Sequence, residues 1–117
     1  MENNRSKGSR YEEQAAAYLE EKGYKIIERN FRCRTGEIDI IAMDGRYLCF
    51  IEVKYRNSTV NGFPEEAVTK NKQHIIYRVA MFYLKKNGIG FESPCRFDVV
   101  SILDEKITLY KNAFGSM

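Results

Sequence analysis

The sequence predicts an α/β fold in which two helices flank a mixed central sheet. Apolar residues recur at helical spacing in two stretches, near 6–22 and 65–87. Between and after them lie short runs rich in β-branched and aromatic residues, so the expected order is helix, three strands, helix, two strands. Because 117 residues can bury a core of their own, we expect a single domain over 1–117, with its core at about 6–110.

The composition is that of an ordinary globular protein, with 44% hydrophobic and 30% charged residues. The net charge of +3 only slightly favours a polyanionic partner. Cys33, Cys49 and Cys95 are odd in number and lack metal-ligand spacing, so we expect free thiols in a reducing compartment. No apolar run approaches the ~20 residues of a membrane span and no signal-peptide core opens the chain, so we expect a cytoplasmic protein. His74 is the single histidine, which excludes sites built from several histidines.

The first helix is expected from about Ser6 to Lys22, with Gly23 ending it. Glu12 lies at the edge of its apolar stripe, from which a carboxylate could reach a neighbouring sheet. Alternatively, Ser9 and Glu12 form a capping box. Spacing alone does not separate these interpretations.

A short first strand is expected at Tyr24–Glu28, followed by the basic segment Arg29–Arg34, which contains one aromatic residue. Such a segment could contact the phosphates of a nucleic acid. Alternatively, its charges mark a solvated strand edge that is protected from self-association. A β-hairpin then spans residues 36–54.

The hairpin carries charged side chains inside apolar strands, where charge needs a partner or a metal ion. Asp44-Gly45 between alternating runs favours a two-residue type I′ turn. With that turn, Asp39 would face Phe50 and Glu37 would face Glu52. Since alternate residues share a sheet face, we expect four charged side chains on one face. They are Glu37, Asp39, Glu52 and Lys54.

After a polar surface loop at 57–64, a second helix is expected from near Glu65 or Thr69 to Asn87. Lys70 and Lys72 lie in its first turns, where the helix dipole disfavours cations. This placement indicates a nearby anionic partner, with solvated lysines as the alternative. Two more strands are expected, at Cys95–Leu103 and Lys106–Tyr110.

The acid-x-lysine tripeptide occurs three times, and only Glu52-Val53-Lys54 ends an apolar run. Glu20-Glu21-Lys22 and Asp104-Glu105-Lys106 look like surface charge at a helix end and a turn. Asp39 and Glu52, on adjacent strands, could bind one hard cation such as Mg²⁺ or Mn²⁺, with the Val53 carbonyl as a further ligand.

A cation at that place would polarise a phosphate and lower the pKa of a bound water. Lys54 could orient this water or neutralise developing charge, and Glu12 could complete a second metal position or steer the water. Glu37, at the strand start, is not assigned to the metal. The alternative is a structural ion network around Glu52 and Lys54.

These residues resemble the pattern of the PD-(D/E)XK, or restriction-endonuclease-like, nuclease superfamily. More closely, the chain resembles the YraN-like family of small bacterial proteins, which is related to archaeal Holliday junction resolvases. The resemblance runs from Gly8 to Ile102 and rests on a series of motifs. They are Glu12 with Ala15, Tyr18 and Leu19, then Gly23-Tyr24, Asn30-Phe31-Arg32, Gly36-Glu37-Ile38-Asp39, Phe50-Ile51-Glu52-Val53-Lys54, Arg56, Thr69 with Lys72, and Arg96-Phe97-Asp98-Val99-Val100.

The resemblance implies a restriction-endonuclease-like αβββαβ core in which Asp39, Glu52 and Lys54 take the superfamily's metal and lysine positions. It also implies that Glu12 is the acidic residue of the first helix, which favours function over the capping box. Two positions depart from the pattern. Tyr11 stands where relatives often have glycine and narrows the approach to Glu12, and Ile38 stands where the superfamily has proline before the first acid.

The function that the resemblance implies is Mg²⁺- or Mn²⁺-dependent hydrolysis of phosphodiester bonds in DNA, rather than RNA, including branched or structured DNA. The alternative is a non-cleaving nucleic-acid-binding module on the same fold, and a structural protein is a third reading. A homodimer would fit a junction-type enzyme, although no residue requires one. The expected nucleic-acid-binding residues are Arg32, Arg34, Arg56, Lys70 and Lys72.

Overall fold

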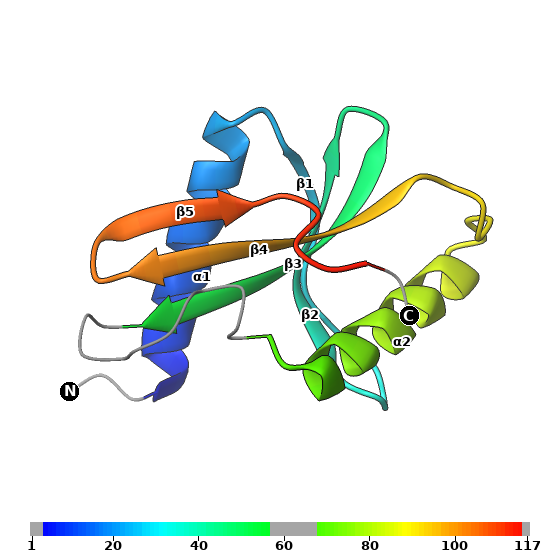
Figure 1. The fold of residues 1–117 in the computed structure, drawn as a ribbon, viewed down its shortest axis with the longest axis horizontal. Coiled ribbons are helices and arrows are strands. Elements are labelled where there is room, and N and C mark those ends of the chain that lie inside the picture. The colour runs from blue at the N-terminus through cyan, green and yellow to red at the C-terminus, as the bar shows by residue number, and fades with distance from the viewer. Residues whose placement is uncertain (1–3, 57–67, 116–117) are drawn as a thin grey trace.

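The computed structural model describes residues 4–56 and 68–115 of the chain. Within these ranges the protein forms two helices and five strands (Figure 1). The elements are α1 (Asn4–Glu21), β1 (Lys25–Arg32), β2 (Glu37–Asp44), β3 (Tyr47–Arg56), α2 (Lys70–Lys86), β4 (Cys95–Leu103) and β5 (Lys106–Tyr110). This order confirms the predicted α/β class and its restriction-endonuclease-like αβββαβ succession.

The strands form one sheet in the order β1-β2-β3-β4-β5. Only β3 and β4 are parallel, and the other neighbouring pairs are antiparallel, so the sheet is mixed as predicted. Two parallel neighbours need a long crossover rather than a hairpin, and α2 lies in the connection between them. The antiparallel strands β1-β2-β3 therefore build one side of the sheet and the β4–β5 hairpin the other, and the crossover through α2 joins them.

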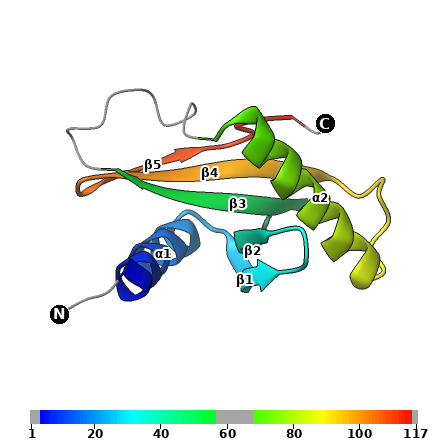
Figure 2. The same ribbon diagram turned by 90° about the horizontal axis from the view of Figure 1, so that it is seen from below.

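The two helices cover opposite faces of the sheet (Figure 2). On one face, Ala15 and Leu19 of α1 pack against Ile40, Ile51 and other buried residues, here called the α1-side core. On the other face, α2 residues pack against Phe50 and Phe97 in the α2-side core. The buried α2 residues are Ile76, Val79, Ala80, Tyr83 and Leu84. The helical spacing of the apolar residues in the sequence thus corresponds to burial.

The first strand is longer than predicted, since it continues through most of the basic segment to Arg32. Its pairing with β2 runs to Arg32–Glu37, which holds these residues in the sheet. Because β1 is the outermost strand, the basic residues lie on a sheet edge. For the second helix, Thr69 is the N-cap, and its side chain accepts a hydrogen bond from the Lys72 amide at 3.2 Å. The predicted loop at 57–64 lies outside the described residues.

The predicted hairpin register is wrong by two residues. The turn is Gly45-Arg46, closed by the pair Asp44–Tyr47. Gly45 has φ 61°, and Arg46 is absent from the described non-glycine residues with positive φ, so only the first turn residue is left-handed, as in a type II′ turn. Asp44 instead ends β2, where its carboxylate accepts a hydrogen bond from Arg96 at 2.7 Å. Tertiary contacts of Asp44 therefore override the local turn preference.

Two further expectations can be compared with the structure. Cys33, Cys49 and Cys95 are all free, as predicted. Neither helix in the described ranges is long and apolar enough to span a bilayer.

Candidate active site

The candidate site lies where β2 and β3 separate, and this opening between the two strands is called the fork. The last described pair between these strands is Ile40–Ile51, so the next residues, Asp39 and Glu52, stand at the opening. Figure 1 shows β1 and β2 turning down and away from β3, β4 and β5 at this place. The two acids thus lie beside each other, whereas the predicted register placed Asp39 opposite Phe50 and Glu37 opposite Glu52. Because the register error is an even number of residues, it did not scatter them to opposite faces.

The alternation of side chains along β2 is interrupted at Asp39. Ile38 belongs to the α2-side core and Ile40 to the α1-side core, although residues two apart in a regular strand share a face. Asn30 of β1 lies opposite Asp39 in the register and has a left-handed backbone, with φ 56°. The interruption directs Asp39 into the fork. There, its Oδ2 atom accepts a hydrogen bond from the Val53 amide at 2.8 Å.

Asp39 and Glu52 form a close pair of carboxyl groups. Glu52 is only 6% exposed, and its side chain hydrogen-bonds with that of Asp39. Burial, followed by the charge of Glu52, raises the pKa of Asp39 far above its ordinary value. Two adjacent acids that are withdrawn from water cannot both ionise easily without a counter-charge. Without a cation, Asp39 therefore tends to keep its proton, and a cation in the fork would favour ionisation of both carboxyl groups.

Two lysines approach the same oxygen of Glu52. The Nζ atom of Lys54, on the same strand, lies 3.6 Å from Glu52 Oε2, and that of Lys72, from the first turn of α2, lies 3.8 Å from it. The sequence indicated an anionic partner for the lysines in this turn, and for Lys72 that partner is Glu52. Both distances exceed those of a short charge-assisted hydrogen bond. The lysines are thus within reach of the carboxylate and also of an anionic ligand.

Glu12 reaches towards the fork from α1, and its negative charge contributes to the raised pKa of Asp39. The capping-box interpretation is wrong, because α1 begins at Asn4 and Ser9 therefore lies inside the helix. The Glu12 side chain is only 14% exposed, and its Oε1 atom has no hydrogen-bond partner; Arg29 Nη2 lies 3.8 Å away. Burial raises the pKa of Glu12, while a hydrogen bond with Asn30 and the charge of Arg29 oppose the rise.

Asn30 is a residue that sequence reasoning did not single out for the site. It contacts Glu12, and its left-handed backbone coincides with the interruption in β2. Asparagine is among the few residues other than glycine that adopt this conformation readily. The available signal was an asparagine two residues beyond the predicted first strand, because asparagine is depleted in regular strands and tolerates positive φ.

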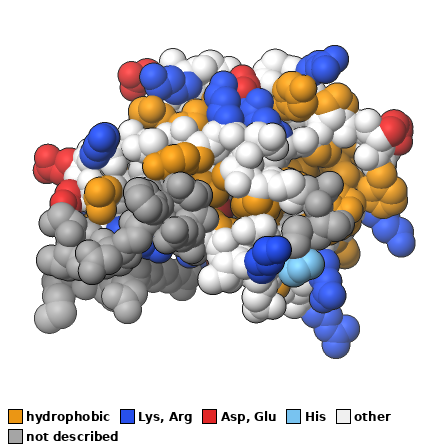
Figure 3. All heavy atoms as spheres, in the orientation of Figure 1, with side chains coloured by type: hydrophobic (Ala, Val, Ile, Leu, Met, Phe, Trp, Pro, Cys, Tyr) orange, Lys and Arg blue, Asp and Glu red, His pale blue; other side chains and the backbone are white. Residues whose placement is uncertain are grey.

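The remaining charged residues are divided between the site and the sheet edge. Glu37 does not join the acids; its Oε2 atom accepts a hydrogen bond from Arg32 Nε at 3.1 Å. Arg34 is exposed in the turn between β1 and β2. Arg56 ends β3, two residues beyond Lys54, and Lys70 is exposed at the start of α2. On the face seen in Figure 3, Lys and Arg side chains flank the histidine of α2. The predicted basic residues thus lie on three separate elements, the β1 edge with its turn, the end of β3 and the start of α2.

The chemistry of the donor set fits a small divalent cation. In the described ranges, no group of three or more His, Cys, Asp or Glu side chains is arranged to hold a metal ion. Mg²⁺, however, is commonly bound by one or two carboxylates, with water and substrate phosphate completing its shell. Asp39 and Glu52 supply the carboxylates, and Val53, whose amide binds Asp39, brings its backbone to the same place. The Glu12 oxygen without a hydrogen-bond partner is a further hard donor nearby.

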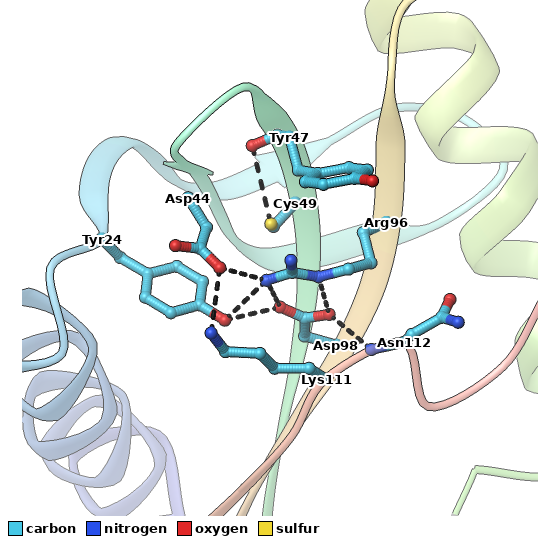
Figure 4. Close-up of polar contacts among 8 residues, drawn as sticks. All are labelled: Tyr24, Asp44, Tyr47, Cys49, Arg96, Asp98, Lys111 and Asn112. Carbon is cyan, nitrogen blue, oxygen red and sulfur yellow. Dashed lines mark hydrogen bonds and ion pairs between the residues drawn. The ribbon is translucent and has the colours of Figure 1, made fainter.

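A second polar cluster is built around Arg96 and Asp98 of β4 and includes Asp44 at the hairpin tip (Figure 4). Asp98 is fully buried and accepts hydrogen bonds from Tyr24 at 2.8 Å and from Arg96 and the Asn112 amide at 2.9 Å. Arg96 also bonds Asp44 at 2.7 Å, and this hydrogen bond is the main cause of the lowered pKa of Asp44. Because its groups satisfy one another, the cluster fits a structural role. It joins the end of α1, the hairpin, β4 and the C-terminal segment.

Comparison with known proteins places this chain in a family. Residues 11–102 match the family described as Uncharacterised protein family UPF0102. A UPF0102 protein of Lachnoclostridium phytofermentans is 53% identical over 114 residues, covering 97% of each chain. A UPF0102 protein of Syntrophus aciditrophicus is 46% identical over 118 residues, covering 97% of this chain and 92% of the relative. A UPF0102 protein of Clostridium botulinum is 44% identical over 117 residues, covering 95% of each chain. The matched range contains Glu12, Asp39, Glu52 and Lys54.

Proposed function

The chain belongs to the UPF0102 family, the YraN-like family that its motifs resemble, and we propose that it is a metal-dependent endonuclease that hydrolyses phosphodiester bonds in DNA, with branched or otherwise structured DNA as its substrate. One observation carries the proposal. The carboxyl groups of Asp39 and Glu52 meet at the opening between β2 and β3, with Lys54 3.6 Å from Glu52. Two adjacent acids, one buried and one half-buried, are unfavourable by themselves, and a bound Mg²⁺ or Mn²⁺ would stabilise them.

A divalent cation held by Asp39 and Glu52 would supply Lewis-acid activation of water and stabilisation of phosphate charge. The protein side chains have separate tasks around it. Lys54 lies where its ammonium group can hold the attacking water or offset the negative charge that develops on the phosphate. Glu12, whose Oε1 atom has no hydrogen-bond partner, can accept a proton or hydrogen bond from that water. Lys72 can bind a phosphate oxygen of the substrate, since its ion pair with Glu52 is long.

The same ion pairs support a competing interpretation. Lys54 and Lys72 both neutralise Glu52, as they would in a structural ion network with no metal ion. The two interpretations differ in what a metal ion should do. A metal site predicts that Mn²⁺ binds and raises the melting temperature, because a ligand that binds only the folded state stabilises it. An ion network predicts no such change.

Activity is tested by incubating the full-length protein with a panel of duplex, forked and four-way-junction DNAs in Mg²⁺, Mn²⁺ or EDTA. We expect cleavage of at least one branched DNA in the presence of metal, and we expect Glu52→Gln to reduce its rate by at least about 100-fold. The matched control is Glu20→Gln, because Glu20 belongs to an acid-x-lysine tripeptide on the exposed end of α1. Equal rates for the two variants would refute the proposal. Circular dichroism checks that both variants fold.

The non-cleaving alternative makes a different prediction for the same panel. It requires binding that weakens with salt, since lysine and arginine contacts release counterions from the nucleic acid, but no product in any metal. A Mn²⁺ soak of crystals gives an independent measurement. Anomalous density between Asp39 and Glu52 is the expected result, and its absence at saturating Mn²⁺ would contradict the metal site.

A further inference from the structure

A groove runs beside the candidate site, between α1 and the end of the sheet formed by β3 and the β4–β5 hairpin. Its volume is about 950 Å³, within the usual range of ligand sites, roughly 300–1,000 Å³. Three tyrosines line it, Tyr11 and Tyr18 from α1 and Tyr55 from β3. Figure 1 shows α1 crossing behind the ends of β3, β4 and β5. Two of the elements that form the groove, α1 and β3, therefore also contribute residues to the candidate site.

Two of the tyrosines form a preassembled stack. The ring centroids of Tyr11 and Tyr55 are 3.8 Å apart and their planes differ by 10°. Tyr55 remains 36% exposed although one face of its ring is covered. Flat aromatic surfaces of this kind bind nucleobases by stacking, regardless of sequence. Because the two rings already order each other, a base that adds to the stack would lose little side-chain entropy from the protein.

The two stacked tyrosines are the sequence neighbours of two proposed catalytic residues. Tyr11 precedes Glu12, and Tyr55 follows Lys54. Successive residues of a strand point to opposite faces, so Lys54 and Tyr55 lie on opposite sides of β3. Among the described residues, no strand pairs with the β2-facing edge of β3 beyond Ile51. A single nucleotide could pass this edge, so that its phosphate stays near Lys54 while its base reaches Tyr55.

The charges in the groove favour a base over a phosphate. Three acidic side chains line it, Glu21, Asp104 and Glu105, and they outnumber Arg10, which is also in the lining. Carboxylates repel the nucleic-acid backbone but accept hydrogen bonds from the exocyclic amino groups of bases. A base inside an intact duplex could enter only after unpairing and unstacking, which costs a few kcal/mol. An unpaired base meets no such barrier.

We propose that this groove binds one unpaired nucleobase of the DNA substrate, stacked on Tyr55 and Tyr11, and so selects DNA with an unpaired nucleotide next to the cleaved bond over continuous duplex. This inference rests on the proposed function, because it requires DNA at the fork. It names the feature of structured DNA that the protein recognises. It also gives a role to Tyr11, which stacks on Tyr55.

The test uses 2-aminopurine, a base whose fluorescence is quenched by stacking. The probe is placed at the first unpaired position of a forked DNA, and in a fully paired duplex of the same sequence as the comparison. Binding to the full-length protein is measured in Ca²⁺, with fluorescence anisotropy of a distant label giving the affinity. We expect the probe to be quenched in the forked DNA and unchanged in the duplex.

Substitutions of Tyr55 decide the outcome. Tyr55→Leu should abolish the quenching and weaken forked-DNA binding by roughly 5- to 150-fold, the factor that corresponds to one stacked base, and leave duplex binding unchanged. Tyr55→Trp keeps an aromatic ring and should preserve both signals. Phe91→Leu is the matched control, since Phe91 is 66% exposed and lies in a different pocket. Melting temperatures confirm that each variant is folded.

Two results would overturn the inference, and they differ in what they imply for the fork. If wild-type protein cleaves forked DNA while Tyr55→Leu cleaves and binds it equally well, the groove does not hold a base, and the proposed function stands. If wild-type protein binds no DNA of any structure at low salt, both the groove and the proposed nuclease function fail.

Discussion

Replacing Asp39 with asparagine should stabilise the metal-free protein, and the gain should be larger at pH 8 than at pH 5. Asparagine retains an oxygen that can accept the Val53 amide, now bound to Asp39 Oδ2 at 2.8 Å, but it cannot ionise beside Glu52. In the wild type, burial and the Glu52 charge raise the pKa of Asp39 to about 8. The unfolded chain has the ordinary aspartate pKa, about 3.9.

The sign and the size of the effect follow from proton linkage. Between these two pKa values the folded protein holds a proton on Asp39 that the unfolded chain has released, so raising the pH favours unfolding. Asp39 therefore contributes most to stability at low pH, and this contribution is lost as the pH rises towards 8. One proton corresponds to at most about 1.4 kcal/mol per pH unit, so the advantage of Asp39→Asn can grow by up to about 4 kcal/mol from pH 5 to pH 8.

The assay is urea unfolding at pH 5, 6, 7 and 8 in EDTA, with the free energy of unfolding of the variant compared with that of wild type at each pH. Asp104→Asn, an exposed aspartate in the turn between β4 and β5, is the matched control. Adding Mn²⁺ should stabilise the wild type more at pH 8 than at pH 5, because a cation binds the deprotonated carboxylate. Mn²⁺ should have little effect on Asp39→Asn.

A free-energy difference that stays constant from pH 5 to pH 8 would refute this reasoning. It would mean that Asp39 is neither desolvated nor close to an ionised Glu52 in solution. The fork would then be more open than the structure indicates, and the argument for a metal site would lose its electrostatic basis.

Three other predictions concern separate features of the structure. Asn30→Gly keeps a residue that tolerates φ 56° but removes the contact with Glu12, so DNA cleavage should fall by about 10- to 100-fold with little loss of stability. Asn30→Ala removes the same contact and also strains the backbone, so it should in addition lower the free energy of unfolding by about 1–2 kcal/mol. Gly36→Ala would place a Cβ atom 2.7 Å from Ile75 Cγ2 and should destabilise the protein by about 1–3 kcal/mol in urea unfolding. If that clash is the cause, Gly36→Ala should cost less free energy of unfolding in an Ile75→Ala background than in the wild type. Asp98→Ala leaves buried hydrogen-bond donors without their carboxylate and should lower the free energy of unfolding by about 3–5 kcal/mol. The affinity for Mn²⁺ should stay unchanged. A loss of Mn²⁺ binding would instead show that this cluster and the fork are coupled.

The elements of the fold could be predicted because their signals are local. The spacing of apolar residues identified both helices, and the strands β4 and β5 begin and end where the sequence predicts. The hairpin turn was misplaced by one residue, because the local preference of Asp44-Gly45 competes with the contact between Asp44 and Arg96, 52 positions away in the chain. A pattern in neighbouring residues carries no information about such a contact.

The candidate site was predicted in part. Asp39, Glu52 and Lys54 were identified from context, and the structure brings them together. Glu37 was grouped with them only because uninterrupted alternation was assumed, and it instead pairs with Arg32. The break at Asp39 depends on a left-handed Asn30 in the neighbouring strand, which follows from packing on two faces at once.

By itself, the sequence determined the succession of helices and strands, the buried faces and the acids of the hairpin, since each depends on residue periodicity within one segment. Tertiary structure alone decided that β2 and β3 part at Asp39 and Glu52, that Lys72 of α2 reaches Glu52, and that Tyr11 stacks on Tyr55. These features join segments that are distant in the chain. Their positions are set by how two helices and a twisted sheet fill space together, which periodicity within a single segment does not specify.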